Sequence, residues 1–447
     1  MTFETKGKEN NGATYGRRSD WQDLYSIAKK YYEALLADPG NAQFHLTDPR
    51  GASDKSGRTF NNPYQYFFEQ MHMDDAIYAD ESIYEYPMQQ GGGNDGRPYS
   101  FGRPSSGGSK AAYPCKSYGQ GRINPAYFYG VFDPNDMRRD VSITMTGSNG
   151  KGVEKLIPFV PNSKAEGGGL TLNKWDENRQ ANPWVAAQRK SGINGPYMRM
   201  SEVYLGYAEV CAALGDVVTG KQYLKTVRER SFPQGLANTD AFIASFGNDL
   251  VRAIIEERGF EYAGEGDRRW TLIRSGYLPE DIKRIKDMTK AMMDGLATKG
   301  YYEFENGNII SAYIWTKLVD AKTIYGHRLT AQCPTDKVND PVLYPGWRGQ
   351  KDNWEEMGLN YGSSTPATNL AIKGLFEIVS EEEAASLESQ GYAKVNWGID
   401  LVDYRDEYDK YLFWDYDYVS APIYLWPFTP NVMAAGGFTN GYGFKQE

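Results

Sequence analysis

The sequence predicts a mainly α-helical fold that carries long irregular loops. Apolar side chains recur at helical spacing in residues 15–40 and 196–276, which predicts a helical scaffold there. Glycine, proline, serine, asparagine and tyrosine dominate residues 86–195 instead, without a strong periodicity. Such a long stretch in a compact chain is usually a functional loop region. We therefore expect the helices to form a frame and the loops to form a ligand-binding side.

The first predicted helix covers residues 20–36. Asp20 is a suitable N-cap, and the proline and glycine at positions 39 and 40 end the helix. Residues 63–79 form a second amphipathic stretch, which predicts another helix. The apolar side chains of the first helix are predicted to share one face, and they are Leu24, Ile27, Ala28, Tyr31 and Leu35.

Residues 198–230 predict two further helices. Their aromatic and alanine packing is compatible with tetratricopeptide-like helical pairs, although the repeat period of roughly 34 residues is not visible. Glu202 and Glu209 lie seven positions apart on one helix face. We expect them to pair with Arg228 or Arg230 of the next helix.

Charged and aromatic residues alternate at helical spacing in residues 256–276. Arg252 and Glu256 lie four positions apart, as do Glu257 and Glu261, so each pair shares a helix face. Two glycines a few residues later mark the helix end. We interpret these charges as a network that supports the scaffold, because such networks usually orient elements of structure.

This segment resembles the C-terminal signature of the SusD/RagB family, surface nutrient-binding lipoproteins of Bacteroidetes. Thr271 stands where the family usually has aspartate. Further segments match the family in order, so the resemblance covers about residues 15–444; they are 62–64 with 81–85, 196–215 with 223–230, and 425–430 with 439–443. The signature residues that match are Glu257, Arg258, Glu261, Glu265, Gly266, Arg268, Leu272, Arg274 and Gly276.

The resemblance implies one SusD-like domain over residues 1–447, with tetratricopeptide-like helical pairs. It implies a lipid-anchored protein at the outer-membrane surface that binds oligosaccharide or polysaccharide without catalysis. It also implies delivery of that ligand to a SusC-like TonB-dependent transporter. The first residues of the chain contain no charged n-region, apolar h-region or cleavage-site cysteine, so we expect this chain to lack the N-terminal portion of the family.

The aromatic residues of the loops indicate a glycan site. A sugar ring has apolar faces and a rim of hydroxyls, so its site needs flat aromatic rings with amides, carboxylates or arginines around them. A second aromatic loop region is predicted over residues 340–365, with Trp347 and Trp354. The ligand-binding residues that we predict are Tyr99, Tyr113, Tyr118, Asn94, Arg97 and Arg122.

Composition excludes several other classes of function. The chain has 58 acidic and 49 basic residues, a net charge of -9 and no lysine or arginine stripe, which argues against nucleic acid as a partner. No apolar run approaches the roughly 18 residues of a membrane span. Three cysteines and three histidines are too scattered for a zinc site or a disulfide framework, so we predict no metal and no cofactor. Cys211 is predicted to be a small core residue.

Three alternatives remain beside glycan capture. The family includes peptide binders, and tyrosine serves protein interfaces as well as glycan sites. A glycoside hydrolase would need two carboxylates about 5 to 10 Å apart, and acidic pairs such as Asp403/Asp406 and Asp415/Asp417 exist, although none is singled out. A structural helical-repeat adaptor would bind protein partners only. We predict a protein that is not an enzyme.

Overall fold

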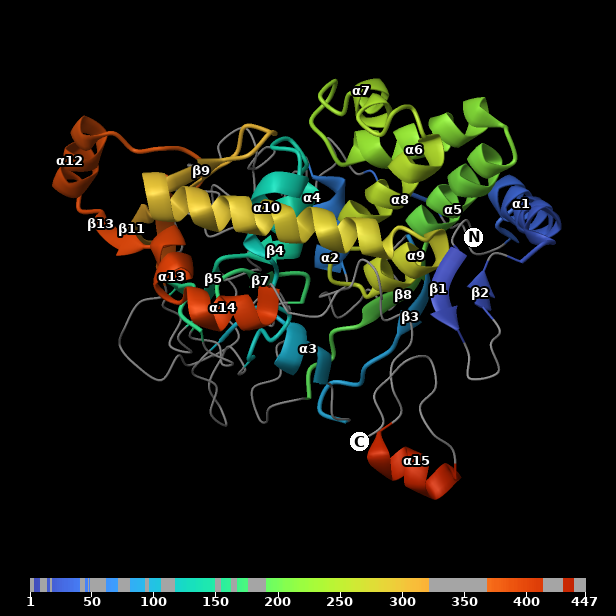
Figure 1. Cartoon of the computed structure of the whole chain (residues 1–447), viewed down its shortest axis with the longest axis horizontal. Coiled ribbons are helices and arrows are strands. Elements are labelled where there is room, and N and C mark those ends of the chain that lie inside the picture. Colours follow the sequence, from blue (N-terminus) through green and yellow to red (C-terminus); the bar gives the residue numbers. More distant parts are fainter. Residues whose placement is uncertain are drawn as a thin grey trace.

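Helices dominate the structure, a computed structural model, and the strands form small antiparallel sheets (Figure 1). This confirms the mainly α-helical fold that the sequence predicts. The structure describes residues 4–8, 14–16, 18–40, 45–46, 48, 62–70, 81–92, 96–105, 117–148, 154–161, 167–175, 190–320, 368–412 and 429–437.

The scaffold helices gather at the right of Figure 1, and α5 is central because it contacts α1, α6 and α8. Asp216 begins α6 by accepting a hydrogen bond from the backbone N–H of Thr219 at 3.2 Å. The helices expected over residues 15–40 and 198–230 are confirmed. The bounds are α1 (Trp21–Ala37), α5 (Met200–Ala213), α6 (Val217–Arg230), α7 (Thr239–Ala244), α8 (Leu250–Glu261) and α9 (Asp267–Ser275).

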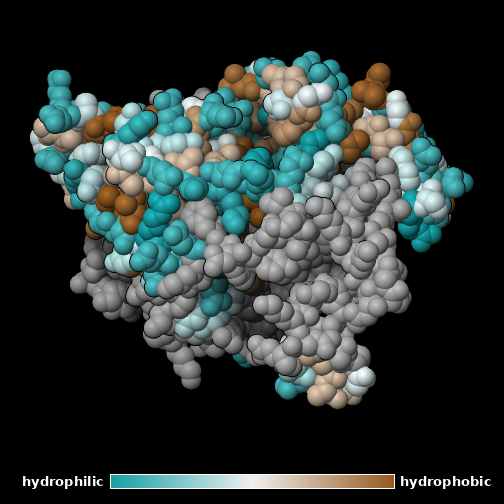
Figure 2. All heavy atoms as spheres, in the orientation of Figure 1, coloured by the Kyte–Doolittle hydropathy of each residue, from teal (hydrophilic) through white to brown (hydrophobic). Residues whose placement is uncertain are grey.

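Helix α10 (Leu278–Lys299) crosses the molecule from this scaffold to the sheets on the left of Figure 1. Hydrophilic residues cover its outer side in Figure 2, whereas Met292, Met293 and Leu296 are buried beneath it. Strands β9 (Tyr301–Glu303) and β10 (Ile309–Ser311) form a hairpin. A three-stranded sheet follows in the order β12-β11-β13, and the remaining elements are β11 (Tyr313–Asp320), β12 (Thr368–Lys373), α12 (Glu381–Ser389), β13 (Ala393–Asn396), α13 (Gly398–Asp403), α14 (Arg405–Leu412) and α15 (Pro430–Gly436).

The largest apolar core lies between α10, these sheets and the middle of the chain. Trp397 is fully buried in it, packs against Phe159 with ring centroids 4.3 Å apart, and donates a hydrogen bond to the Tyr129 hydroxyl at 2.8 Å. This core ties the loop-rich middle of the chain to the C-terminal sheet.

Short elements interrupt the region that the sequence predicts as loops. The β3–β8 ladder joins the start of this region to its end, with Tyr84 opposite Met198. The elements from β3 onward are β3 (Ser82–Tyr86), α3 (Gly96–Phe101), η2 (Tyr127–Val131), α4 (Arg138–Ser142), β4 (Ile143–Thr144), β5 (Thr146–Ser148), β6 (Glu154–Leu156), β7 (Thr171–Leu172) and β8 (Gly195–Arg199). Before this region lie β1 (Glu4–Lys8), β2 (Thr14–Gly16) and α2 (Pro63–Gln70). Helix α2 matches the first part of the predicted helix at 63–79, and residues 71–79 lie outside the described residues.

The apolar face that the sequence predicts for α1 is wrong in part. Leu24, Ile27 and Tyr31 are exposed. The side chains that pack against α5 are instead Tyr25, Ala28, Tyr32 and Leu36. The surface of α5 determines which face of α1 is covered. Tyr25 donates a hydrogen bond to Glu209 of α5, and the glycine at position 206 leaves room for the Tyr32 ring.

Two smaller expectations for the scaffold have different outcomes. Cys211 is fully buried in the α1–α5 contact, as predicted. Asp20 stands at the N-cap of α1, but its side chain makes no capping hydrogen bond. The carboxylate instead accepts hydrogen bonds of 2.8 Å from Arg18.

Candidate functional site

A set of buried arginines and carboxylates, which we call the ionic network, holds the candidate site on the scaffold. Each member is at most 3% exposed. Glu261 of α8 accepts hydrogen bonds from Arg230 at 2.6 Å and Arg138 at 3.1 Å. Arg199 of β8 also contacts Glu261 and donates to Glu81 at 2.8 Å. The ionic network consists of Glu81, Asp136, Arg138, Arg199, Arg228, Arg230, Glu257 and Glu261.

The electrostatics of the ionic network favour charged carboxylates. Burial alone would raise the pKa of Glu81 and of Glu261. The surrounding guanidiniums, Arg230 and Arg199 foremost, outweigh burial and hold the pKa of both groups below the ordinary glutamate value. These carboxylates are therefore fixed partners of arginines, which agrees with the scaffold role that the sequence predicts.

The partners predicted for Glu202 and Glu209 are wrong. Glu202 contacts Arg258 at 2.8 Å, and Glu209 accepts a hydrogen bond from Arg274 at 2.7 Å. Arg228 and Arg230 point into the ionic network instead, where Arg228 meets Glu257 at 2.9 Å. The two glutamates of α5 therefore meet different helices, because Arg258 belongs to α8 and Arg274 to α9.

Thr271 stands at the signature position where aspartate is usual, and its side chain makes polar contacts there. Its hydroxyl donates to Asp267 at 2.8 Å and accepts from Arg258 at 3.3 Å. The predicted pair Arg252/Glu256 is confirmed at 2.9 Å. Across the turn between α8 and α9, Arg258 therefore contacts both Asp267 and Thr271.

Three of the predicted ligand-binding residues lie together. The Tyr99 and Tyr118 rings meet edge to face with centroids 5.0 Å apart, and Arg122 donates to the Tyr118 carbonyl at 3.4 Å. Tyr99 is only 8% exposed, whereas Tyr118 and Arg122 are half-buried. Burial lowers the pKa of Arg122 to about 10, which leaves the guanidinium charged at neutral pH.

The other predicted ligand-binding residues are less fully described. Arg97 belongs to α3, and its side chain lies outside the described part of the structure. Asn94 and Tyr113 lie outside the described residues, as does the aromatic region at 340–365 with Trp347 and Trp354. The predicted contacts of these residues with ligand remain predictions.

A second aromatic surface lies on the β3–β8 ladder, and sequence analysis missed it. Tyr84, Tyr86, Tyr197 and Met198 are 56%, 53%, 74% and 42% exposed, and we call them the tyrosine face. The Tyr84 and Tyr197 rings meet edge to face, with centroids 5.6 Å apart and planes at 88°. Such an arrangement is favourable for aromatic pairs and leaves ring surface open to a ligand.

The pairing of β3 with β8, whose register is irregular on both sides of Tyr84, produces the tyrosine face, and it leaves the adjacent residues Tyr197 and Met198 both exposed. Ser82, Glu85 and Arg199 are buried on the inner side of the same ladder, where Glu85 accepts a hydrogen bond from Asn194 at 2.9 Å. The signal lies in residues 84–86, where two tyrosines flank Glu85. It could have been found by treating this matched segment as a half-buried strand.

The described residues show no grouping of histidine, cysteine, aspartate or glutamate side chains that could hold a metal ion. No helix in the described part of the chain is long and apolar enough to cross a membrane.

A helical scaffold held by buried ion pairs, with irregular segments and exposed tyrosines beside it, defines a mainly α-helical class of protein. Comparison with known families gives the particular family. The SusD family pattern matches residues 43–428, so the chain belongs to the SusD family.

Individual relatives have low sequence identity to this chain. The chain is 28% identical over 160 residues to a SusD-like protein of Formosa agariphila, which covers 36% of this chain and 26% of the relative. A SusD homologue from Bacteroides thetaiotaomicron has a TM-score of 0.41 and 17% identity, over 60% of this chain and 51% of that chain. Surface glycan-binding protein A from the same organism, in complex with laminarihexaose, has a TM-score of 0.40 and 20% identity, over 58% of this chain and 52% of that chain. The chain thus spans about half the length of these solved structures and about a quarter of the curated relative.

Proposed function

We propose that this chain is part of a noncatalytic cell-surface protein that binds an oligosaccharide or polysaccharide and delivers it to a SusC-like TonB-dependent transporter. Membership of the SusD family supports this function and an outer-membrane location with a lipid anchor. The single observation that carries glycan binding is the tyrosine face, because its exposed rings can stack on the apolar faces of sugars. Tyr118 and Arg122 supply a second set of ligand contacts.

The carboxylates that the sequence analysis considered give no support to a hydrolase. A hydrolase needs one carboxylic acid with a raised pKa beside a second carboxylate. Burial would raise the pKa of Glu209, but Arg274 outweighs burial and lowers it. Asp403 and Asp406 lie exposed on the surface, and Asp415 and Asp417 lie outside the described residues.

The test is calorimetry and affinity electrophoresis against plant, host and microbial polysaccharides, laminarihexaose included. We expect binding without release of reducing ends. The double variant Tyr84→Ala/Tyr197→Ala should weaken binding about tenfold or more, because each lost ring contact removes apolar burial of about 1.5 kcal/mol. Tyr31→Ala is the matched control, since Tyr31 is 72% exposed and Tyr197 is 74% exposed. Equal binding by the double variant and the control would refute a role for the tyrosine face.

A peptide is the second candidate ligand. Met198 adds an apolar, flexible side chain beside the tyrosines, and methionine and tyrosine are both enriched in protein interfaces. Binding of a mixed peptide digest by wild type, with no binding of any polysaccharide, would favour this alternative.

A further inference from the structure

The strands that carry the tyrosine face turn their charged side chains away from it. Strands β3 and β8 contain one carboxylate, Glu85, and one guanidinium, Arg199. Glu85 is 4% exposed and accepts a hydrogen bond from Asn194 at 2.9 Å. Arg199 is 1% exposed and pairs with Glu81 and Glu261. The exposed side chains of these two strands are therefore phenols and a thioether, without a charge.

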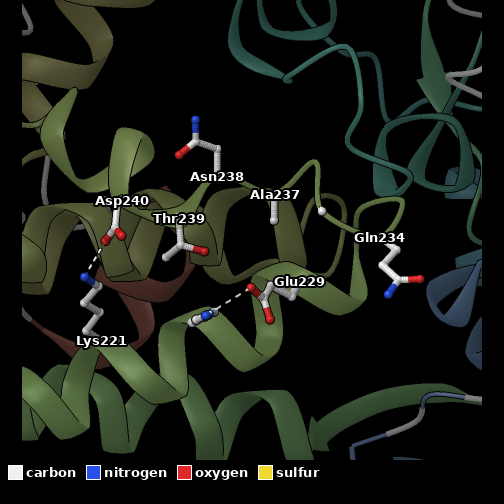
Figure 3. A pocket seen from close by; sticks show the side chains of 9 residues that line it. Lys221, Glu229, Gln234, Ala237, Asn238, Thr239 and Asp240 are labelled. Atoms are coloured by element: carbon white, nitrogen blue, oxygen red, sulfur yellow. Dashed lines mark ion pairs between the residues drawn. The ribbon is translucent and has the colours of Figure 1, made fainter.

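The scaffold offers the opposite chemistry at the start of α7. A hollow of about 740 Å³ lies between α6 and the segment that leads into α7, and charged side chains line it (Figure 3). Lys221 forms an ion pair with Asp240, and Lys225 lies 3.5 Å from Glu229. No aromatic ring is among the described residues that line this hollow. It therefore gives a sugar no stacking surface, unlike the tyrosine face.

An uncharged aromatic surface discriminates between ligands by their charge. The face of an aromatic ring carries partial negative charge, so it attracts polarised C–H groups and repels carboxylates and sulfates. An anionic group that lies against such a ring also gives up water without gaining a counter-ion. The net charge of -9 adds a long-range repulsion for a polyanion. A neutral sugar meets none of these costs, and its hydroxyls can pair with the phenol hydroxyls.

We propose that the tyrosine face is specific for uncharged segments of a glycan and excludes glycans that carry uronates or sulfates. This inference rests on the proposed function, because it names the class of glycan that the same site binds. The apolar faces of neutral sugars stack on Tyr84 and Tyr197, and Met198 extends the apolar contact. Arg199 is the cation of these two strands, and its burial on the inner side prevents it from neutralising an anion on the outer side.

The first experiment is affinity electrophoresis with two sets of probes. Laminarin, amylopectin and galactomannan are neutral, whereas alginate, polygalacturonate and carrageenan are anionic. At least one neutral probe should bind wild type about tenfold or more tightly than any anionic probe does. Raising sodium chloride from about 50 to 500 mM should change the affinity for that neutral probe by less than about twofold. Tyr84→Ala/Tyr197→Ala should lose this binding, and Tyr31→Ala should keep it.

The second experiment places a cation on the tyrosine face. Met198→Lys should raise the affinity for at least one anionic probe about tenfold, because the ammonium supplies the missing counter-charge, and high salt should remove this gain. Leu24→Lys is the matched control, since Leu24 and Met198 are both 42% exposed and the control adds the same charge on α1. It should bring no such gain. Both variants should melt within about 2 °C of wild type, because both positions are exposed.

Three outcomes would overturn the specificity for uncharged glycans and leave glycan capture itself standing. The first is tight binding of an anionic probe that Tyr84→Ala/Tyr197→Ala abolishes. The second is a neutral probe that binds this double variant as well as it binds wild type. The third is an equal gain for anionic probes in Met198→Lys and Leu24→Lys. Absence of binding to every probe, neutral and anionic, would overturn the proposed function together with this inference, and binding of a peptide digest instead would identify the peptide alternative.

Discussion

The β3–β8 ladder presents two different surfaces, one buried and charged and the other exposed and aromatic. On the inner side, Arg199 joins Glu81 and Glu261 in a network that is closed to water. On the outer side, Tyr84 and Tyr197 contact each other and remain open to solvent. The inner side chains are therefore expected to determine folding, whereas the outer ones are free to determine what the surface binds.

The largest test of this comparison is Glu261→Gln. This change leaves the charges of Arg199, Arg230 and Arg138 without one of their buried partners, which should lower the free energy of unfolding by about 3 to 5 kcal/mol. Chemical denaturation measures the change. Arg405→Ala is the control, since its 2.8 Å pair with Asp294 is partly exposed and should be worth at most about 1 kcal/mol. Similar losses in both variants would mean that the ionic network is not the main support.

Acid should weaken the same inner side. Glu81 and Glu261 have folded-state pKa values below their ordinary value of 4.5, so the unfolded chain binds more protons as the pH falls. Their contribution is complete above about pH 4.5 and is lost progressively below it, by about 2 kcal/mol or more at pH 3. Denaturation curves at pH 3, 4, 5 and 7 check this, and a flat profile across that window would contradict it.

A smaller effect is expected at the contact between α5 and α9. Glu209→Gln should lower the free energy of unfolding by about 1 to 2 kcal/mol, because the buried carboxylate loses its charge-assisted bonds to Arg274. A double-mutant cycle with Arg274→Met should show coupling, and the cycle with Arg228→Met should show none. Coupling of Glu209 to Arg228 instead would support the partner that the sequence predicts for Glu209 and contradict its pairing with Arg274.

The smallest effect on stability is expected on the outer side. Tyr84→Ala/Tyr197→Ala should change the free energy of unfolding by less than about 1 kcal/mol, since both rings are more than half exposed. Thermal and chemical unfolding measure this in the same samples that are used for binding. A loss as large as that of Glu261→Gln would show that the rings support the fold, and the separation of the two surfaces would fail.

The sequence predicts correctly those features that depend on residues close together in the chain. The helical spacing gave α5 and α6, and the four-residue spacing of Arg252 and Glu256 gave their ion pair. It failed where a partner far along the chain decides the outcome. The exposed face of α1 is more apolar than the packed face that carries Tyr25 and Tyr32, and only the surface of α5 shows which face is covered.

The candidate site shows the same limit. Tyr99 and Tyr118 lie in the glycine-rich region predicted as loops, and the structure brings them together with Arg122, yet it buries the Tyr99 ring. The tyrosine face needs two strands that lie more than a hundred positions apart in sequence, and their pairing places Tyr84 beside Tyr197. The sequence of β3 alone indicates neither the irregular register of this pairing nor the ring that Tyr84 meets.

The closed inner network has a consequence for how such a protein can diversify. Positions 84 and 197 contribute to none of the buried ion pairs, so mutation can sample them at little cost to folding. A lineage can then change this exposed surface by substituting a few outward side chains while the charged interior stays unchanged. Because the buried ion pairs hold the ladder in place, its exposed side tolerates substitution.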